Sequence, residues 1–277
     1  MNEYSKYFLV SDLDGTLINS RQQISSENLS AIKHFIDNGG IFSVATGRTN
    51  QTARLHIKEL PINGPCVLYN GSGIYDLVNE RFYYTEYLDK SRIIEYVEYC
   101  MNRFGTMIVE IFSPDMMYIV TPKENVDPYV MLENQIFEHA VLKDILNIEW
   151  IKIMFSDTPE NLAEAAEVLK AYGLEDVVDS VFSHQQYFEI LKKDVSKGSA
   201  LKYLKQMEEY RDRIFIAVGD FDNDIEMVKA ADLGVAVENA REGVKQAADK
   251  ITVSNDQNAI HDIIFNIIPG LCKEQNK

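Results

Sequence analysis

The stretch Tyr7-Phe8-Leu9-Val10-Ser11-Asp12-Leu13-Asp14-Gly15-Thr16 decides the fold. A short run of apolar and small residues ends abruptly at a turn that holds two carboxylates, a glycine and a hydroxyl. An apolar run of this length predicts a buried strand of a parallel sheet. Open parallel sheets bind ligands in the crevice outside the carboxyl ends of their strands. We therefore expect the polar turn to carry the function.

The same alternation of strand, polar turn and helix continues along the chain. Apolar residues at helical spacing follow Ser25 and Ser26 and end at Gly39-Gly40, which predicts a helix with both ends marked. Strands separated by helices predict parallel βαβ units with helices on both faces of the sheet. Further strands of this sheet are expected at residues 41–45, 66–69, 214–218, 234–237 and 251–253.

The middle of the chain has a different character. Its strand-like runs at residues 107–112, 117–120 and 150–155 are not followed by acidic or glycine-rich turns of the earlier kind. A chain of 277 residues is also long for one domain. We therefore predict a core formed by residues 1–82 and 183–277, interrupted by an inserted α/β domain over residues 83–182.

Composition narrows the classes of function. The net charge is −16 and the sequence pI is about 4.7, with no dense Lys/Arg cluster, so nucleic-acid binding is not expected. Cys66, Cys100 and Cys272 show neither disulfide-framework nor zinc spacing, which favours a reducing cytoplasm. No run reaches membrane-spanning length and no signal-peptide core is evident, so no membrane partner is expected.

Asp12 and Asp14 can supply two of the groups that phosphate-ester hydrolysis requires. One carboxylate can attack phosphorus while the other handles the proton of the leaving group. An EF-hand calcium loop is excluded, because Gln23 stands where the twelfth ligand would be a glutamate. A plain turn remains an alternative for this motif taken alone.

Other polar turns can supply positive charge and phosphate ligands. Thr46 and the backbone at Gly47, at the start of an expected helix, are suited to hold a phosphate, and Arg48 can bind it or brace the loop. Lys197 precedes another expected helix and offers a compact point charge. Taken singly, a helix cap or a surface lysine is the more common use of such residues.

The segment Gly219-Asp220-Phe221-Asp222-Asn223-Asp224 follows a further strand. Its carboxylates would repel one another and the Asp12/Asp14 pair unless a cation lay among them. Hard oxygen ligands of this kind suit Mg²⁺. An isolated exposed acidic loop is the alternative.

Together these motifs resemble the haloacid dehalogenase (HAD) superfamily, in its Cof-type sugar-phosphatase branch. Asp12-Leu13-Asp14-Gly15-Thr16-Leu17 is similar to the first motif of that family, Thr46-Gly47-Arg48 to the second, Lys197-Gly198 to the third and Gly219–Asp224 to the fourth. The resemblance implies a Rossmann-like core with an inserted α/β cap that closes over the active site.

By the resemblance, Asp12 is the nucleophile that forms an aspartyl-phosphate and Asp14 is the general acid and base. It also implies Mg²⁺ as cofactor. The implied metal ligands are Asp12, Asp14 through its carbonyl, Asp220 and Asp224; the implied substrate and phosphate ligands are Thr46, Gly47, Arg48, Asn70, Lys197 and Asn223.

The expected activity is hydrolysis of a small phosphorylated metabolite, with sugar phosphates favoured by the resemblance alone. Two alternatives stay open: a phosphomutase, which shares these motifs, and a metabolite-binding protein on the same scaffold. The motifs indicate neither the individual substrate nor the oligomeric state.

Overall fold

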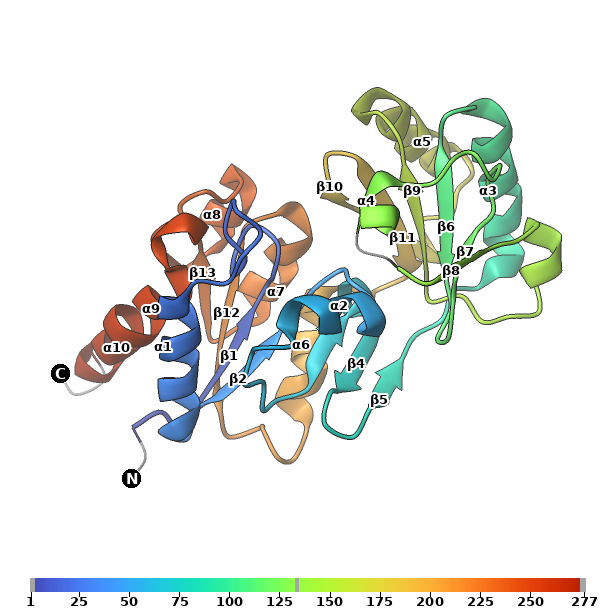
Figure 1. Ribbon diagram of the computed structural model, residues 1–277. Coiled ribbons are helices and arrows are strands. Elements are labelled where there is room, and N and C mark those ends of the chain that lie inside the picture. Colours follow the sequence, from blue (N-terminus) through green and yellow to red (C-terminus); the bar gives the residue numbers. More distant parts are fainter. Residues whose placement is uncertain (1–2, 133–134, 275–277) are drawn as a thin grey trace. The chain divides into compact units, whose positions relative to one another are not determined.

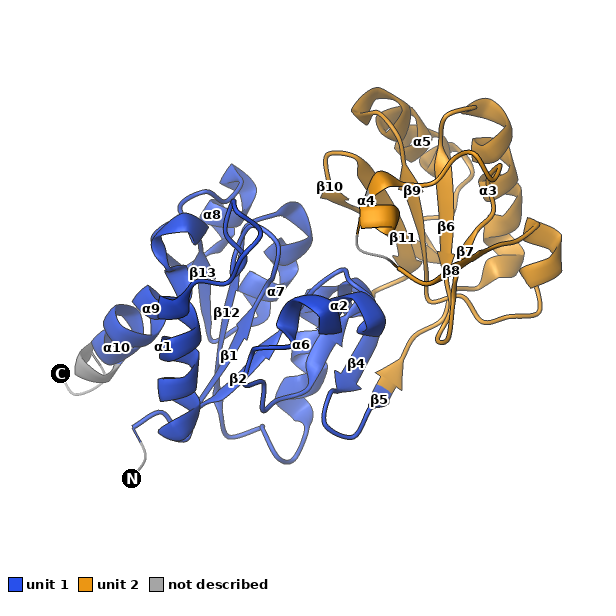
Figure 2. Ribbon diagram, viewed as in Figure 1, with its two compact units in different colours: residues 1–83, 196–277 blue, residues 84–195 orange. Residues whose placement is uncertain are grey.

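The computed structural model describes residues 3–132 and 135–274. The chain divides into two compact units, one formed by residues 1–83 and 196–277 and the other by residues 84–195 (Figure 2). The second unit ends at Val195 instead of the expected residue 182. The reason is that β10 (Val178–His184) pairs with β11 (Tyr187–Lys192), which in turn pairs with β9 (Lys152–Ser156) of the second unit.

The first unit is built on a five-stranded sheet in the order β14-β13-β12-β1-β2. Every adjacent pair in it is parallel, and all residues of β1 and β2 are buried. This arrangement confirms the expected parallel α/β core. The strands are β1 (Tyr7–Ser11), β2 (Ile41–Val44), β12 (Ile214–Gly219), β13 (Leu233–Ala236) and β14 (Lys250–Ile251).

Helices flank this sheet, with α1 and α9 packed together on one face and α6 and α7 packed together on the other (Figure 1). The Ser25 side chain caps α1, and Ser196 with Ser199 forms a capping box at the start of α6. The helices of this unit are α1 (Ser26–Asp37), α2 (Asn50–Ile57), α6 (Lys197–Gln206), α7 (Ile225–Ala230), α8 (Glu242–Ala247), α9 (Ala259–Asp262) and α10 (Ile268–Glu274).

A small antiparallel sheet adjoins the end of β2. It contains β3 (Cys66–Leu68), β4 (Gly73–Asp76) and β5 (Arg81–Thr85) in that order. A parallel bridge between Ala45 and Val67 links β3 to the main chain just after β2. The turn that follows β3 therefore lies beside the turn that follows β2.

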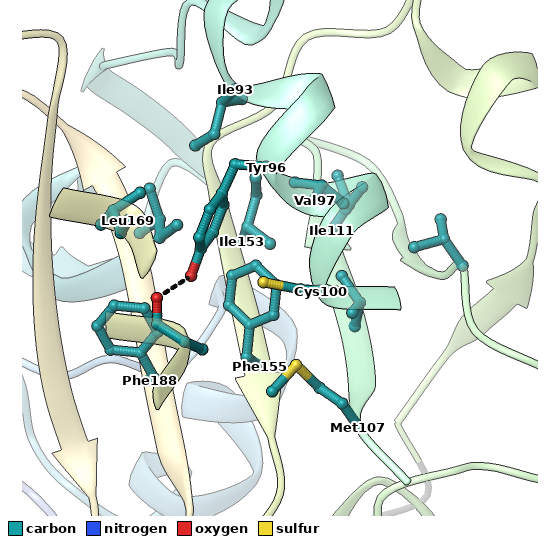
Figure 3. Packing of buried hydrophobic residues seen from close by; sticks show 14 of the residues in the cluster. Ile93, Tyr96, Val97, Cys100, Met107, Ile111, Ile153, Phe155, Leu169 and Phe188 are labelled. Atoms are coloured by element: carbon teal, nitrogen blue, oxygen red, sulfur yellow. Dashed lines mark hydrogen bonds between the residues drawn. The ribbon is translucent and has the colours of Figure 1, made fainter. Parts of the chain in front are cut away.

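The second unit has a six-stranded sheet in the order β10-β11-β9-β6-β7-β8. Its neighbouring strands are antiparallel except for the β7–β8 pair. One face packs against α3 and α5 around a large apolar cluster, part of which Figure 3 shows. Its remaining elements are α3 (Lys90–Arg103), β6 (Ile108–Phe112), β7 (Met117–Ile119), α4 (Pro128–Leu132), β8 (Phe137–His139), a 3₁₀ turn (Leu142–Ile145) and α5 (Pro159–Ala171).

Two observations bear on the expectations about disulfides and membrane-spanning segments. Cys66 and Cys100 are buried free thiols. Within the part of the chain that the structure describes, no helix combines the length and the apolar character needed to cross a lipid bilayer.

Candidate active site

The polar turns predicted from the sequence meet at one edge of the main sheet. β1 lies between β12 and β2 and is parallel to both, so the three strands end at the same edge. Asp12 follows β1, Asp220 follows β12, and Thr46 lies two residues beyond the end of β2. This edge is where an open parallel sheet presents its ligand-binding residues.

A buried lysine joins two of these turns. Lys197, the first residue of α6, places its Nζ 2.6 Å from Asp12 Oδ1 and 2.6 Å from Asp224 Oδ1. The three side chains are almost fully buried, with exposed fractions of 1%, 9% and 0% for Lys197, Asp12 and Asp224. Removing three charges from water is unfavourable unless they are paired at short range, as they are here.

The Asp224 carboxylate binds the backbone of its own loop, which follows β12. Asp224 Oδ2 accepts hydrogen bonds from the backbone N–H groups of Asp220 and Phe221, at 3.0 and 3.2 Å. Asp220 Oδ1 accepts a hydrogen bond of 2.7 Å from the Thr16 hydroxyl. Gly15 has a φ of +83°, and a Cβ there would lie 2.5 Å from Asp220 Oδ2. The approach of the two turns therefore requires glycine at this position.

Asp12, Asp220 and Asp224 together form a candidate cation site. Among the described residues they are the one group of three or more potential metal ligands whose ligand atoms lie within 4.8 Å of one another. All three offer carboxylate oxygens, the ligands that Mg²⁺ prefers. The donor set therefore fits the cation expected from the sequence.

The raised pKa values of these carboxyl groups also favour a bound cation. Burial raises the pKa of Asp220 to about 7, and the charge of Asp224 adds to the rise. Burial also raises the pKa of Asp12, where Lys197 opposes the rise and the neighbouring carboxylates add to it. The single ammonium of Lys197 thus does not fully balance three carboxylates, and a divalent cation would supply the missing positive charge.

Asp14 points to a different partner. Its carboxylate forms two hydrogen bonds with the Arg48 guanidinium, Nε–Oδ2 at 2.8 Å and Nη2–Oδ1 at 2.9 Å. The Asp14 side chain is 48% exposed, whereas that of Arg48 is 17% exposed. Arg48 therefore braces the first turn in this structure, one of the two roles that the sequence left open. The Asp14 carboxylate lies outside the group of Asp12, Asp220 and Asp224.

Thr46, Gly47, Asn70 and Asn223 form a second part of the site. Thr46 is buried, and its carbonyl accepts a hydrogen bond of 3.0 Å from the Asn70 backbone N–H. Asn70 Oδ1 accepts one of 2.9 Å from Asn223 Nδ2, which fixes the orientation of the Asn70 amide. Asn70 Nδ2 is buried without a hydrogen-bond partner, and a Cβ at Gly47 would lie 2.9 Å from it. The amide hydrogens thus face the space that glycine leaves open.

Two contacts at the site were not expected from the sequence. Asn239 Nδ2 donates a hydrogen bond of 2.8 Å to the Gly15 carbonyl and so holds the first turn from a third loop. One feature of the sequence could have predicted this contact. Asn239 follows β13, a strand of the same sheet, just as the other residues of the site follow strands. Asp222 forms an ion pair with Arg241 and is not part of the carboxylate group.

Comparisons with known proteins bear on the identity of this site. A model of the haloacid dehalogenase-like hydrolase family matches residues 9–264, which include all of these turns. The chain belongs to the haloacid dehalogenase-like hydrolase family.

Relatives of known name support this assignment. The chain is 28% identical over 253 residues to the 5-amino-6-(5-phospho-D-ribitylamino)uracil phosphatase YcsE of Bacillus subtilis, covering 90% of each chain. It is 29% identical over 286 residues to phosphatase YwpJ of the same organism, covering 93% of this chain and 98% of the relative. A crystal structure of a haloacid dehalogenase-like hydrolase from Bacteroides thetaiotaomicron superposes with a TM-score of 0.78 at 27% identity, covering 96% of this chain and 100% of that one. The resemblance seen in the four motifs is thereby confirmed, and the protein is a hydrolase of this family.

Proposed function

We propose that this haloacid dehalogenase-like hydrolase is a Mg²⁺-dependent phosphatase that forms an aspartyl-phosphate on Asp12. The observation that carries the proposal is the environment of that carboxylate. Asp12 lies at the carboxyl end of β1, between β12 and β2, 2.6 Å from the buried Lys197 ammonium and grouped with Asp220 and Asp224. A nucleophilic carboxylate beside a buried ammonium and a candidate cation site is what attack on an anionic phosphate ester requires.

In the first step, an Asp12 carboxylate oxygen attacks phosphorus and the bond from phosphorus to the ester oxygen breaks. The departing ester oxygen keeps the electron pair and takes a proton from the Asp14 carboxyl. The leaving group is thereby released as the free alcohol. Lys197, the Thr46 hydroxyl and the Gly47 backbone bind the phosphoryl oxygens. Because the Asp14 carboxylate is bound to Arg48 in this structure, Asp14 must leave Arg48 to carry that proton.

In the second step, Asp14 removes a proton from water while the water oxygen attacks phosphorus. The bond between phosphorus and the Asp12 oxygen breaks, which releases phosphate and restores the Asp12 carboxylate. Asp12, Asp220 and Asp224, with the Asp14 carbonyl, would hold Mg²⁺. The bound cation supplies charge neutralisation for the phosphoryl oxygens. Asn223 holds the Asn70 amide so that its hydrogens are available to the substrate.

The substrate is a small phosphorylated metabolite in this proposal, with sugar or sugar-alcohol phosphates favoured. The name of one relative supports this class, since it specifies a ribityl phosphate ester. The second unit interrupts the first in the chain, which supports its assignment as the inserted cap of the family.

Phosphate release from a panel of phosphorylated metabolites tests the proposal. We expect release to require Mg²⁺ and to stop with EDTA, and the Asp12→Asn variant to lose a factor of about 10⁴ or more. Asp220→Asn should lose most of the activity, whereas Asp222→Asn in the same loop should retain it. Transfer of phosphate between two positions of a substrate without release would instead identify a phosphomutase. Release that is unaffected by Asp12→Asn would refute the aspartyl-phosphate mechanism.

A further inference from the structure

The loop that follows β13, residues 237–241, contacts both turns of the candidate cation site. Its backbone binds the turn after β12, because the Arg241 N–H donates a hydrogen bond of 2.9 Å to the Asp220 carbonyl. Its Asn239 side chain binds the first turn, through the hydrogen bond of 2.8 Å from Nδ2 to the Gly15 carbonyl. The β13 loop therefore helps to fix where these two turns lie relative to each other.

The orientation of the Asn239 amide is determined by a second hydrogen bond. The backbone N–H of Asn255, in the loop after β14, donates to Asn239 Oδ1 at 2.9 Å. A backbone N–H can only donate, so the amide oxygen must face Asn255 and the amide nitrogen must face the Gly15 carbonyl. Although Asn239 is an exposed residue, its side chain is therefore held on both sides.

The Gly15 carbonyl belongs to the planar peptide that joins Gly15 to Thr16. Glycine is the residue least restricted in its backbone conformation, and φ at Gly15 is +83°. A peptide next to such a residue depends on contacts from outside the turn to keep one orientation. The hydrogen bond from Asn239 supplies a contact of this kind.

The orientation of this peptide matters for Asp220. The Thr16 side chain is buried, and its hydroxyl donates a hydrogen bond of 2.7 Å to Asp220 Oδ1. Gly15 is also close to that carboxylate, since a Cβ at this position would lie 2.5 Å from Asp220 Oδ2. A rotation of the Gly15–Thr16 peptide would therefore move groups that touch one of the three carboxylates. Asn239 thus acts on Asp220 through two residues of the first turn.

A second asparagine offers a matched comparison. Asn255 Nδ2 donates a hydrogen bond of 3.0 Å to the Ile18 carbonyl, further along the same loop. This end of the loop also closes on itself, because Asn19 Oδ1 accepts two backbone hydrogen bonds of 3.0 Å from within it. The contact at Ile18 should therefore support the loop without acting on Asp220.

We propose that Asn239 is a positioning residue of the candidate cation site, which sets the affinity of that site for Mg²⁺ through Gly15, Thr16 and Asp220. The inference rests on the proposed function, because it concerns the ion that the phosphatase would use. Residues that orient metal ligands without binding the ion themselves lower the metal affinity when they are altered. Asn239 does so by holding the peptide next to the Thr16 hydroxyl.

Calorimetric titration with Mg²⁺, in the absence of substrate, tests the inference. We expect Asn239→Ala to raise the Kd for Mg²⁺ by about 5- to 10-fold, the value of about one hydrogen bond. Asn255→Ala removes a bond of the same kind, from an asparagine amide to a backbone carbonyl, and keeps the N–H that orients Asn239. It should leave the Kd for Mg²⁺ unchanged.

Urea unfolding in the absence of Mg²⁺ separates positioning from general support. Both substitutions remove an amide that binds a carbonyl of the same loop, so both should lower the unfolding midpoint by similar amounts. Phosphate release supplies an independent readout. Asn239→Ala should require more Mg²⁺ for half-maximal release and should recover at excess Mg²⁺, whereas Asn255→Ala should follow the Mg²⁺ dependence of the unaltered protein.

The outcomes distinguish this inference from the proposed function. A Kd for Mg²⁺ that is unchanged in Asn239→Ala would overturn the inference, and so would an equal rise in Asn255→Ala. Mg²⁺ that does not bind to the unaltered protein would overturn it as well, because Asn239 would have no ion to affect. Weaker Mg²⁺ binding in Asn239→Ala alone, in a protein that releases phosphate from no metabolite, would support the inference and count only against the phosphatase activity.

Discussion

Glu110 should make the stability of the second unit depend on pH in a direction opposite to that of most carboxylates. Its pKa is raised from 4.5 to about 8 in the folded chain, mainly by burial, with further effects from Asp127, Lys152 and Glu189. Between these values the folded chain holds a proton that the unfolded chain releases. Stability is therefore fully present below the unfolded pKa and is lost as the pH rises toward the folded pKa.

The size of the effect follows from the same difference. Each pKa unit corresponds to about 1.4 kcal/mol, so raising the pH from about 4.5 to 8 should remove about 4 to 5 kcal/mol from the free energy of unfolding of this unit. Glu110→Gln has nearly the same shape and does not titrate, so it should lack this component. The difference between the two proteins isolates Glu110 from every other titrating group that they share.

The chain contains a suitable reporter for this measurement. Trp150 is the single tryptophan, is fully buried, and belongs to the apolar cluster of the second unit. Urea unfolding followed by tryptophan fluorescence at pH 5, 6, 7 and 8 therefore reports on the unit that holds Glu110. Glu138→Gln, on the exposed side of β8, serves as a carboxyl-to-amide control. Parallel pH curves for the unaltered protein and Glu110→Gln would refute the reasoning, because they would mean that Glu110 stays ionised in the folded chain at little cost.

Three further predictions concern the first unit. Gly15→Ala should destabilise the protein by about 1 to 3 kcal/mol in thermal unfolding and abolish phosphate release, because the new Cβ would lie 2.5 Å from Asp220 Oδ2 at a φ of +83°. Lys197→Met should cost about 3 to 5 kcal/mol in chemical unfolding, since it leaves buried Asp12 and Asp224 without their cation; a change below about 1 kcal/mol would contradict the paired-charge description. Mg²⁺ at about 100 times its Kd should stabilise the unaltered protein by about 2.7 kcal/mol in calorimetry, and Asp220→Asn should lose most of this gain; an equal gain in both would show that the ion binds elsewhere.

Local sequence pattern was sufficient for the framework of the first unit. The apolar run Tyr7–Ser11 forms β1 over those same residues, because a strand that is buried on both faces needs an unbroken apolar run. The polar turns could be placed at one edge of the sheet because parallel strands share an orientation. In contrast, β10 (Val178–His184) was missed: it is an edge strand in which Asp179, Ser180 and Ser183 interrupt any apolar pattern.

The side-chain partners within the site could not be predicted in the same way. The motif positions indicated that Asp14, Arg48, Asn70 and Asn223 would lie near one another. They did not indicate that Arg48 would bind Asp14, or that Asn223 would hold an amide 153 positions away in the chain. Such pairings depend on the register and twist of several strands at once. The charge of Glu110 in the middle of an apolar run was a visible signal in the sequence, but its lack of a partner became evident only from the structure.

Asn28 and Glu110 both contain buried polar atoms without a hydrogen-bond partner, but their surroundings differ. Asn28 also has a buried Nδ2 without a partner, yet its Oδ1 accepts a hydrogen bond of 3.0 Å from the His261 backbone, so half of the amide already joins two helices. At Glu110 both oxygens are unused and the nearby charges are mostly negative, so packing gains nothing from the carboxyl group. Glu110→Leu should therefore raise the free energy of unfolding of the second unit in urea at pH 8, and a lower value than that of the unaltered protein would contradict the absence of a partner for this carboxyl group.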